Sequence, residues 1–447
     1  MIYKTSAYIL KTTNSDGEMI IKNTLTQKSF KVKHENVEEI EKILSGVYEV
    51  ETLSNVAKKL YDNGFLVEDF VDESQIVDYL FNKEIYGNKT LELTIIPTNA
   101  CNFDCVYCYQ KEPYFFMSKE TMDSIILFIE KHIGEYSGLL ISWFGGEPLL
   151  AKELMIEFME KVRMICLKRR IPFYSNVTTN GYELDLKTFK SLITNHVLYY
   201  QITIDGPKEI HNKQRPHKTN NDSFEKIVKN LLDIKEKVKG NRYKIAIRVN
   251  VSTSVQPYIE NFIEWLYNKF GEDNRFTIVW EIVRDWGGEK IKNNKQLILE
   301  DQKSKEWMDV LSNKGFSINM GFEDNDLNLA LCTASKVNGF VVNYDGNIYK
   351  CAMCIENDKY KEINNIGRIS QNGDMIVNTG KMVKWLGKNN TDEKCVMCQH
   401  YPECMGISCP LGSKILKQPV RCKELFIDDY EYLLRNRDVV RNIEYLT

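Results

Sequence analysis

The sequence predicts an α/β fold in which a mainly parallel sheet is covered by helices. Three observations support this prediction. Apolar strand-like segments alternate with helical patterns from residue 91 to about residue 285, short polar motifs directly follow several of these segments, and 447 residues suffice for two to four domains of the usual ~100–200 residues. Alternating β and α segments favour parallel strands joined by right-handed crossovers.

Six apolar segments are the expected strands of this sheet. Amphipathic patterns fill the intervals between them; after the N-cap candidate Ser118, apolar residues recur at helical spacing from Met122 to Ile133. Six successive β/α units would place the helices outside and gather the carboxyl ends of the strands at one edge. The expected strands are Leu91–Pro97, Leu139–Phe144, Phe173–Thr178, Leu198–Ile204, Tyr243–Val251 and Phe276–Ile282.

Residues 1–70 are expected to form a small α+β module, and residues 71–90 a linker helix leading to the sheet. The polar turn Asn14–Gly17 separates the first two strand-like runs, and Asn63-Gly64 ends the second helical pattern. The expected strands are Tyr8–Leu10, Met19–Ile21, Ser29–Lys33 and Phe65–Glu68, and the expected helices are Val37–Leu44 and Leu53–Tyr61.

Composition and charge narrow the class of protein. The net charge is −3 with mixed signs throughout, which indicates neither a nucleic-acid partner nor a membrane surface. No apolar run approaches the ~18 residues of a membrane helix, and the N-terminus lacks a signal-peptide pattern, so a cytoplasmic location is expected. Twelve cysteines in such a chain favour metal or cluster ligation over disulfides. Cys166 stands apart from the others and is expected to be a core residue.

The strongest functional signal is a loop with three cysteines directly after the first strand of the sheet. Cys101, Cys105 and Cys108 form a C-x3-C-x2-C pattern. Three thiolates on one loop can ligate three corners of a cubic iron–sulfur cluster and leave the fourth iron open. The alternative is a structural zinc site, which requires a fourth Cys or His nearby.

This loop, with Tyr107 just before the third cysteine, resembles the cluster loop of radical S-adenosylmethionine (SAM) enzymes. The resemblance implies a partial (β/α)6 TIM barrel over residues 91–288. It also implies a [4Fe-4S] cluster whose open iron binds the amino and carboxylate groups of SAM. One electron, from a donor such as flavodoxin or ferredoxin, then cleaves SAM to a 5'-deoxyadenosyl radical.

The sequence Gly145-Gly146-Glu147-Pro148 follows the second strand and resembles the GGE motif of the same family. Glycines allow close approach of the backbone to a ligand, and Glu147 would accept hydrogen bonds from the ammonium group of SAM. The alternative is a tight strand-to-helix turn in which Pro148 opens the helix.

Further candidate SAM contacts lie at the ends of the third and fourth strands, after the loop of the fourth strand, and on the fifth strand. Asn180 lies in a strand-end sequence that resembles the family pattern, and Thr203 and Asp205 would meet the ribose hydroxyl groups. Arg215 and Arg248 would each pair with the carboxylate of SAM. For both arginines the alternative is an ordinary salt bridge.

A polar connector at residues 289–330, with a short helix at Lys305–Leu311, leads to a cysteine-rich segment at residues 331–447. This cysteine-rich segment has a hairpin around Gly346 near its start and resembles the SPASM domain of radical SAM enzymes that act on peptides. The resemblance implies two auxiliary [4Fe-4S] clusters, and thus three in all. Cys354 is an extra thiol that would complete the first auxiliary cluster or leave it an open iron; paired zinc sites are the alternative. The first set is Cys332, Cys351 and Cys409, and the second is Cys395, Cys398, Cys404 and Cys422.

Residues 1–70 resemble the winged-helix modules, of the RRE or PqqD-like type, that recognise leader peptides by adding them to a sheet edge. A packing-only extension is the alternative. Together the resemblances imply a maturase that forms a cross-link in a ribosomally synthesised precursor peptide. The first expectation for this cross-link is a thioether of the sactipeptide or ranthipeptide type, and the second is a carbon–carbon bond. The alternatives are an anaerobic sulfatase-maturing enzyme that generates formylglycine, and an iron–sulfur electron-transfer or binding protein without SAM chemistry.

Overall fold

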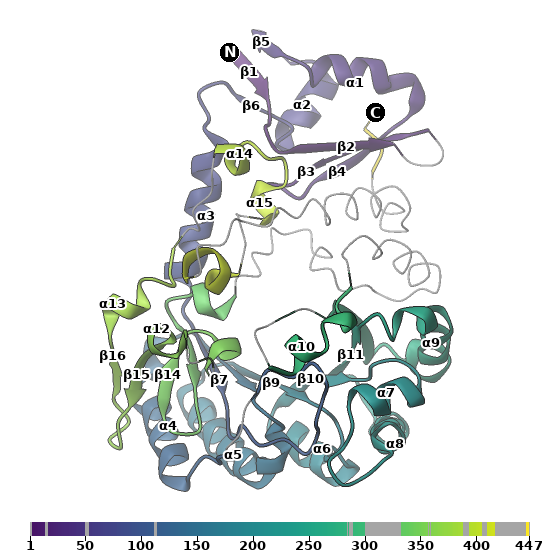
Figure 1. Cartoon of the computed structure of the whole chain (residues 1–447). Helices are drawn as coiled ribbons and strands as arrows, with labels where there is room; N and C mark the ends of the chain where they lie inside the picture. The colour runs from purple at the N-terminus through teal and green to yellow at the C-terminus, as the bar shows by residue number, and fades with distance from the viewer. Residues whose placement is uncertain are drawn as a thin grey trace. The chain divides into compact units, whose positions relative to one another are not determined.

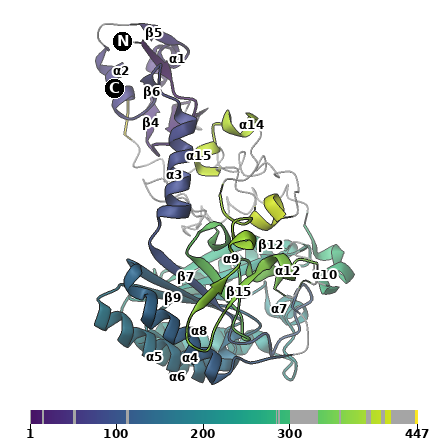
Figure 2. The ribbon, with the colours of Figure 1, turned by 90° about the vertical axis from the view of Figure 1, so that its left-hand side faces the viewer.

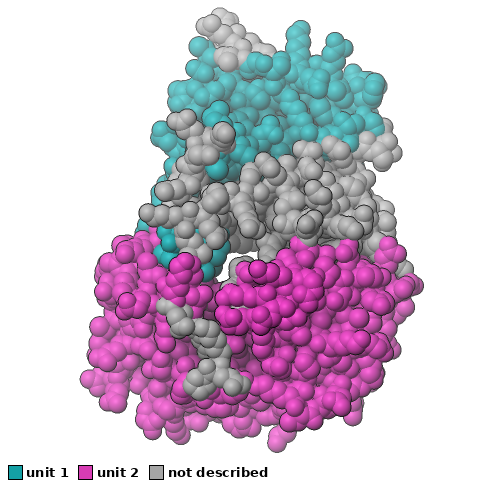
Figure 3. Space-filling model, viewed as in Figure 1, with its two compact units in different colours: residues 1–87, 320–332, 387–447 teal, residues 88–319, 333–386 magenta. Residues whose placement is uncertain are grey.

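The computed structural model describes residues 2–13, 17–49, 53–110, 114–283, 285, 289–299, 332–355, 357, 359–387, 393–404, 409–415 and 444–446. The chain divides into two compact units (Figure 3). One contains residues 1–87, 320–332 and 387–447, and the other contains residues 88–319 and 333–386. The N-terminal module and the residues after 387 therefore belong to one unit.

The second unit is built on a ten-stranded sheet in which the strand order is β12-β11-β10-β9-β8-β7-β13-β14-β15-β16. The six strands β7 to β12 are parallel and follow one another in chain order, which confirms the predicted β/α succession. Their bounds are β7 Thr90–Ile95, β8 Gly138–Trp143, β9 Phe173–Thr179, β10 Val197–Thr203, β11 Lys244–Val251 and β12 Phe276–Ile282.

The predicted hairpin around Gly346 is confirmed, and it extends this sheet. Gly346 has a φ of +78°, which glycine adopts without strain. The strand before the hairpin pairs in parallel with β7, and the following strands are antiparallel. The sequence did not show this pairing, because residues 339–342 and 90–95 lie far apart in the chain. The bounds are β13 Gly339–Val342, β14 Asn347–Tyr349, β15 Asn365–Ile369 and β16 Met375–Val377.

Helices connect the parallel strands and cover the outside of the sheet (Figures 1 and 2). Ser118 caps the first of them, because its hydroxyl oxygen accepts a hydrogen bond from the N–H of Thr121 at 3.1 Å. Cys166 is buried in the core, as expected. The connecting helices are α4 Lys119–His132, α5 Lys152–Arg169, α6 Leu186–Thr194, α7 Lys208–Gln214, α8 Ser223–Lys237 and α9 Ile259–Leu266. The same unit also contains α10 Glu289–Asn293, α12 Lys361–Asn364 and α13 Thr379–Met382, which come after β12 in the chain.

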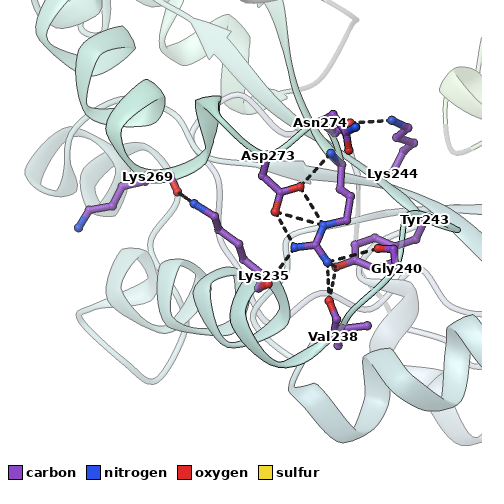
Figure 4. Close-up of polar contacts among 9 residues, drawn as sticks. Lys235, Val238, Gly240, Tyr243, Lys244, Lys269, Asp273 and Asn274 are labelled. Atoms are coloured by element: carbon purple, nitrogen blue, oxygen red, sulfur yellow. Dashed lines mark hydrogen bonds and ion pairs between the residues drawn. The ribbon is translucent and has the colours of Figure 1, made fainter.

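Arg275, just before β12, fixes the carboxyl end of α8. Figure 4 labels its partners Lys235, Val238, Tyr243 and Asp273. Its guanidinium donates hydrogen bonds to the carbonyls of Lys235, at 2.8 Å, and Val238. It also pairs with the carboxylate of Asp273 at 2.5 Å and donates to the hydroxyl of Tyr243 at 2.7 Å. These bonds satisfy carbonyls that have no partner within the helix. The network lies at the amino ends of β11 and β12, away from the strand ends where the candidate site residues gather.

The N-terminal module contains two three-stranded sheets, β2-β3-β4 and β5-β1-β6. The predicted strands and helices are present, together with two short strands that the sequence did not reveal, β1 and β5. Both have only three or four residues, too few for a clear alternation of apolar and polar positions. The bounds are β1 Ile2–Thr5, β2 Ile9–Thr13, β3 Met19–Asn23, β4 Ser29–Val32, α1 Val37–Ile43, β5 Val47–Glu49, α2 Asn55–Asp62, β6 Leu66–Glu68 and α3 Glu73–Gly87.

The module shares an apolar cluster with the cysteine-bearing helices α14 (Glu393–Val396) and α15 (Tyr401–Cys404). Tyr8 and Tyr401 lie in this cluster with three residues of α3, and its partly buried members include Cys395 and Cys398. Lys22 of β3 and Glu403 form a buried ion pair at 2.8 Å. The helix predicted as a linker therefore contributes to the core of a folded unit.

Within the described residues, no helix combines the length and the apolar character needed to span a membrane.

Candidate functional site

The cysteine loop lies at the carboxyl end of β7, and the segment after α7 holds it in place. Backbone hydrogen bonds join the two segments at three points: Lys218 N–H to Asn102 O at 2.9 Å, Asp104 N–H to Pro216 O at 2.8 Å, and Val106 N–H to Gln214 O at 3.0 Å. Cys105 is buried between these contacts, and Cys101 and Cys108 are partly buried. The position of the loop is therefore set by the fourth β/α unit as well as by its own strand.

Glycine is required at positions 145 and 146, after β8, because the backbone there lies very close to the backbone of the cysteine loop. A Cβ atom on Gly145 would lie 2.3 Å from the carbonyl oxygen of Thr98, and φ at Gly145 is +138°. A Cβ atom on Gly146 would lie 2.1 Å from the carbonyl oxygen of Ala100. Both glycines thus let the β8 loop pack directly on the backbone that leads into Cys101.

Glu147 is fully buried and joins the loops after β8 and β9. Its Oε1 atom accepts hydrogen bonds from the Thr179 hydroxyl at 2.6 Å and from the Leu149 N–H at 3.0 Å. Its Oε2 atom accepts from the Asn180 N–H at 2.7 Å. Burial raises the pKa of this carboxyl to about 7, although the three donors oppose the shift. A carboxylate has about four acceptor sites, so these three bonds leave one further site.

A buried polar cluster at the carboxyl ends of β10 and β11 contacts the cysteine loop at Tyr107, the residue before its third cysteine. The Tyr107 hydroxyl donates to Oδ2 of Asp205 and accepts from Nη1 of Arg215 at 2.6 Å. Arg215 also lies 3.8 Å from Asp205 Oδ2, and the N–H of Asn250 donates to Asp205 Oδ1 at 2.8 Å. Burial raises the pKa of Asp205, and the guanidinium of Arg215 counteracts this shift. These contacts fix Asp205 and Arg215 relative to the cysteine loop.

The remaining expected SAM contacts lie at the same edge of the sheet. Thr203 is buried at the last position of β10 and pairs in register with Arg248 of β11. The Nε atom of Arg248 donates to the side-chain oxygen of Asn250 at 2.9 Å. Asn180 donates through its side chain to Asn102 in the cysteine loop, at 2.7 Å. The site residues proposed from the sequence for the barrel thus gather at one edge, each with bonds to other parts of the chain.

The donor set of the loop fits an iron–sulfur cluster, because it offers three soft thiolate ligands on one anchored segment. Burial raises the pKa of the Cys101 thiol to about 12 and that of the Cys105 thiol to about 11. Cysteine binds metal as the thiolate, so binding of iron here would release protons. In the described part of the chain, no three Cys, His, Asp or Glu side chains converge on a single metal ion. In a cubic cluster each iron holds its own cysteine, so the three thiolates need not share one ion.

The cysteines assigned from the sequence to auxiliary clusters fall in both compact units, and their grouping stays a prediction. Cys351 is buried, and its N–H donates to the side-chain oxygen of Asn364 at 2.9 Å; Cys354 lies in the turn that follows. In the other unit, the N–H of Cys398 donates to the carbonyl of Cys395 at 3.1 Å. Cys404 is the last residue of α15, and Cys332 and Cys409 are exposed. Cys422 lies outside the described residues. The predicted helix Lys305–Leu311 also lies outside them.

Sequence reasoning missed three residues of the barrel site. Asn250 binds both Tyr107 and Asp205, Thr179 binds Glu147, and the ring of buried His211 accepts a hydrogen bond from the N–H of Asp205 at 3.1 Å. Asn250 could have been found, because it lies two positions after Arg248 on one strand and therefore on the same face. His211 carried no comparable signal, since it lies on α7 and reaches the site only through tertiary packing.

Comparison with known proteins places a radical SAM domain over this site. Residues 95–249 match the model of the radical SAM superfamily. The cysteine-type anaerobic sulfatase-maturating enzyme of Clostridium perfringens is 26% identical over 349 residues, which cover 71% of this chain and 88% of the relative. The radical SAM model, matched over residues 95–249, spans the cysteine loop from Cys101 to Cys108, Glu147, Asp205 and Arg248.

Two solved structures share the fold. The structure of anSMEcpe with bound AdoMet and the Kp18Cys peptide has a TM-score of 0.60 and 21% identity, and covers 79% of this chain and all of that chain. The structure of Streptococcus suis SuiB bound to the precursor peptide SuiA has a TM-score of 0.51 and 13% identity, and covers 93% of this chain and 97% of that chain. The SuiB match therefore includes parts of this chain that the anSMEcpe match leaves out.

Proposed function

We propose that this radical SAM enzyme forms a cross-link in a ribosomally synthesised precursor peptide, with a thioether as the leading product and a carbon–carbon bond as the next. The observation that carries the proposal is an α+β module with β-sheet edges, residues 1–70, in the same chain as a radical SAM domain. Modules of this kind can bind an extended peptide by strand addition. The breadth of the SuiB match supports the same proposal at the level of the fold.

The roles of the barrel residues follow from their places at the strand ends. Cys101, Cys105 and Cys108 would hold the cluster that binds SAM. SAM, once reduced by one electron, would supply a 5'-deoxyadenosyl radical. The remaining acceptor site of Glu147 would take a hydrogen bond from the ammonium group of SAM. Arg215, whose charge the chain keeps beside Asp205, would lie near the SAM carboxylate.

The other proposed SAM contacts complete the same edge of the sheet. Thr203 and Asp205 would bind ribose hydroxyl groups, Asn180 and Tyr107 would support the loop around SAM, and Arg248 would be a second partner for the carboxylate. Gly145 and Gly146 would keep the cysteine loop close to this edge, since both lie against its backbone.

A thioether requires the removal of two hydrogen atoms from the peptide. One leaves as a hydrogen atom to the deoxyadenosyl radical, which gives 5'-deoxyadenosine. The other leaves as the thiol proton together with one electron. We propose that the cysteines of residues 331–447 would hold two auxiliary [4Fe-4S] clusters, which would supply an acceptor for this electron, and that flavodoxin or ferredoxin would supply the electron that cleaves SAM.

Sulfatase maturation, the oxidation of a protein cysteine or serine to formylglycine, is the second candidate. The sequence similarity to the Clostridium perfringens enzyme favours it. The module at residues 1–70 favours the first candidate instead, because modules of this kind can bind an extended precursor peptide by strand addition.

Mass spectrometry separates these functions. The reconstituted enzyme is incubated anaerobically with SAM, dithionite and a candidate precursor peptide chosen from short open reading frames near the gene, and in parallel with a sulfatase-derived peptide. Loss of two hydrogens per cross-link from the first peptide supports the proposal. Uptake of one solvent deuterium without other mass change would indicate epimerisation instead, and reaction of the sulfatase-derived peptide alone would establish the second candidate.

A further inference from the structure

One edge of the sheet β2-β3-β4 is occupied by a distant part of the same chain, the segment Glu444–Leu446. The N–H of Lys31, in the edge strand β4, donates to the carbonyl of Glu444 at 3.0 Å. The N–H of Leu446 donates in turn to the carbonyl of Lys31 at 2.9 Å. Lys31 and Tyr445 thereby form a parallel bridge, so the segment lies on the edge as a short additional strand.

The side chains of this segment fill specific places on the module. Leu446 is 1% exposed and belongs to the apolar core, together with Phe30 and Val32 of β4 and Ile40 of α1. A leucine from outside the module therefore completes its core.

The residue before this leucine is held by polar and cationic contacts. The hydroxyl of Tyr445 donates to the carboxylate of Glu18 at 2.6 Å, and the ammonium of Lys59 donates to the carbonyl of Tyr445 at 3.2 Å. The ammonium groups of Lys31 and Lys33 lie 5.8 and 5.7 Å from the centre of the Tyr445 ring. Three lysines around one docked residue favour a segment that carries aromatic and acidic side chains.

The occupied edge is formed by the outward-facing backbone groups of β4. Lys31 lies opposite Ile20 of β3, but its own N–H and C=O bind Glu444 and Leu446, so they point away from β3. Alternate residues of an antiparallel strand direct their backbone groups to opposite sides. A second extended peptide could use these two groups only after the segment Glu444–Leu446 had left.

We propose that the β4 edge is the docking site for the precursor peptide and that Glu444–Leu446 is its internal competitor. The identity of the peptide rests on the proposed function; the competition at the edge does not. The edge fits an extended segment with a leucine-like side chain for the core position and an aromatic residue, flanked by acid, immediately before it. While the internal segment occupies the edge, peptide cannot bind there. The apparent affinity for peptide therefore equals the intrinsic affinity multiplied by the fraction of molecules in which the edge is free.

The test uses a fluorescent peptide with the sequence of residues 441–447, Arg-Asn-Ile-Glu-Tyr-Leu-Thr, as the probe. Its binding is measured by anisotropy to the full chain and to a chain that lacks these residues. We expect the shortened chain to bind the probe roughly tenfold or more tightly than the full chain. A probe with aspartate in place of its leucine should not bind, because the aspartate would enter the apolar core.

Two further variants keep the result interpretable. Leu446→Ala in the full chain weakens docking of the internal segment and should give an intermediate probe affinity. Lys31→Pro in the shortened chain removes the outward N–H while sparing the bonds to β3, so probe binding should be lost. The exposed Lys28→Ala is the matched control and should leave binding unchanged.

Far-UV circular dichroism confirms that each variant is folded. Equal probe affinity of the full and shortened chains, no binding to a folded shortened chain, or unchanged binding after Lys31→Pro would each overturn the inference. Because the probe assay involves no SAM chemistry, a failure of cross-linking alone would refute the proposed function and leave the docking edge standing.

Discussion

The hydroxyl group of Tyr107 donates a hydrogen bond to the buried carboxylate of Asp205, and this bond ties the cysteine loop to the end of β10. Tyr107 immediately precedes Cys108, so the bond fixes the loop next to its third thiol. Arg215 binds the same hydroxyl and lies 3.8 Å from the carboxylate, which places a cation beside the pair. The cysteine loop is thus positioned by charge and hydrogen bonding as well as by its own sequence.

Replacing Tyr107 by phenylalanine should destabilise the barrel unit by about 1.5–3 kcal/mol, the usual value of a hydrogen bond to a charged group. The change leaves the ring in place and removes only the hydroxyl between Asp205 and Arg215. Urea unfolding of the cluster-free chain measures the effect. Tyr174→Phe is the control, because Tyr174 is exposed on β9 and should change stability by less than about 0.5 kcal/mol. Equal stability of the two variants would contradict the structural role of the hydroxyl.

Glu147→Gln should remove a pH dependence of stability. In the folded chain burial raises the pKa of Glu147 from 4.5 to about 7, so the native state binds more protons than the unfolded state between these values. Stability contributed by the protonated carboxyl is therefore present below pH ~4.5 and is lost as the pH rises to ~7, by about 3 kcal/mol in total. Urea unfolding of the cluster-free chain from pH 4.5 to 8 should show this decline relative to Glu147→Gln. Parallel pH profiles of the two proteins would refute the shift.

Gly146→Ala should displace the cysteine loop, because the new Cβ atom would lie 2.1 Å from the carbonyl oxygen of Ala100. We expect a loss of about 1–3 kcal/mol of stability from overpacking, together with reduced iron incorporation at the loop. Iron and sulfide analysis after reconstitution checks the second effect. Gly134→Ala is the matched control, since no atom lies within 4 Å of a Cβ at Gly134. Full iron incorporation in Gly146→Ala would show that the loop tolerates the shift.

Arg275→Met should lower the stability of the barrel unit without changing its chemistry. The substitution leaves Asp273 without its ion-pair partner and frees the carbonyls of Lys235 and Val238 at the end of α8 (Figure 4). Removal of one member of a largely buried pair costs about 3 kcal/mol. Thermal unfolding measures the loss, and 5'-deoxyadenosine formation at a temperature where the variant is folded should match that of the unchanged protein. A selective loss of SAM cleavage in folded protein would contradict this assignment.

The order of β/α units and the clustering of functional residues at one sheet edge could be predicted from the sequence. Apolar strands and polar strand-end motifs are local signals, and parallel connectivity then fixes which ends come together. The bonds of Glu147 could not be predicted, because its partners Thr179 and Asn180 lie on a different loop. The same holds for the close approach of Gly146 to Ala100, which only the folded backbone defines.

The N-terminal module shows the limit of local signals more clearly. Its strands around Met19 and Ser29 were predicted from their composition. Its use of Leu446 as a core residue was not, because no local pattern links positions more than 400 residues apart. The predicted linker helix likewise gained its partners, Tyr8 and Tyr401, from opposite ends of the chain.

The most direct test of the central claim is the formation of 5'-deoxyadenosine from SAM under dithionite. The unchanged, reconstituted protein should produce it. A variant with Cys101→Ala, Cys105→Ala and Cys108→Ala should produce none, while iron bound by the cysteines of residues 331–447 remains detectable by electron paramagnetic resonance. Undiminished 5'-deoxyadenosine from this triple variant would contradict the assignment of the loop as the SAM-cleaving site.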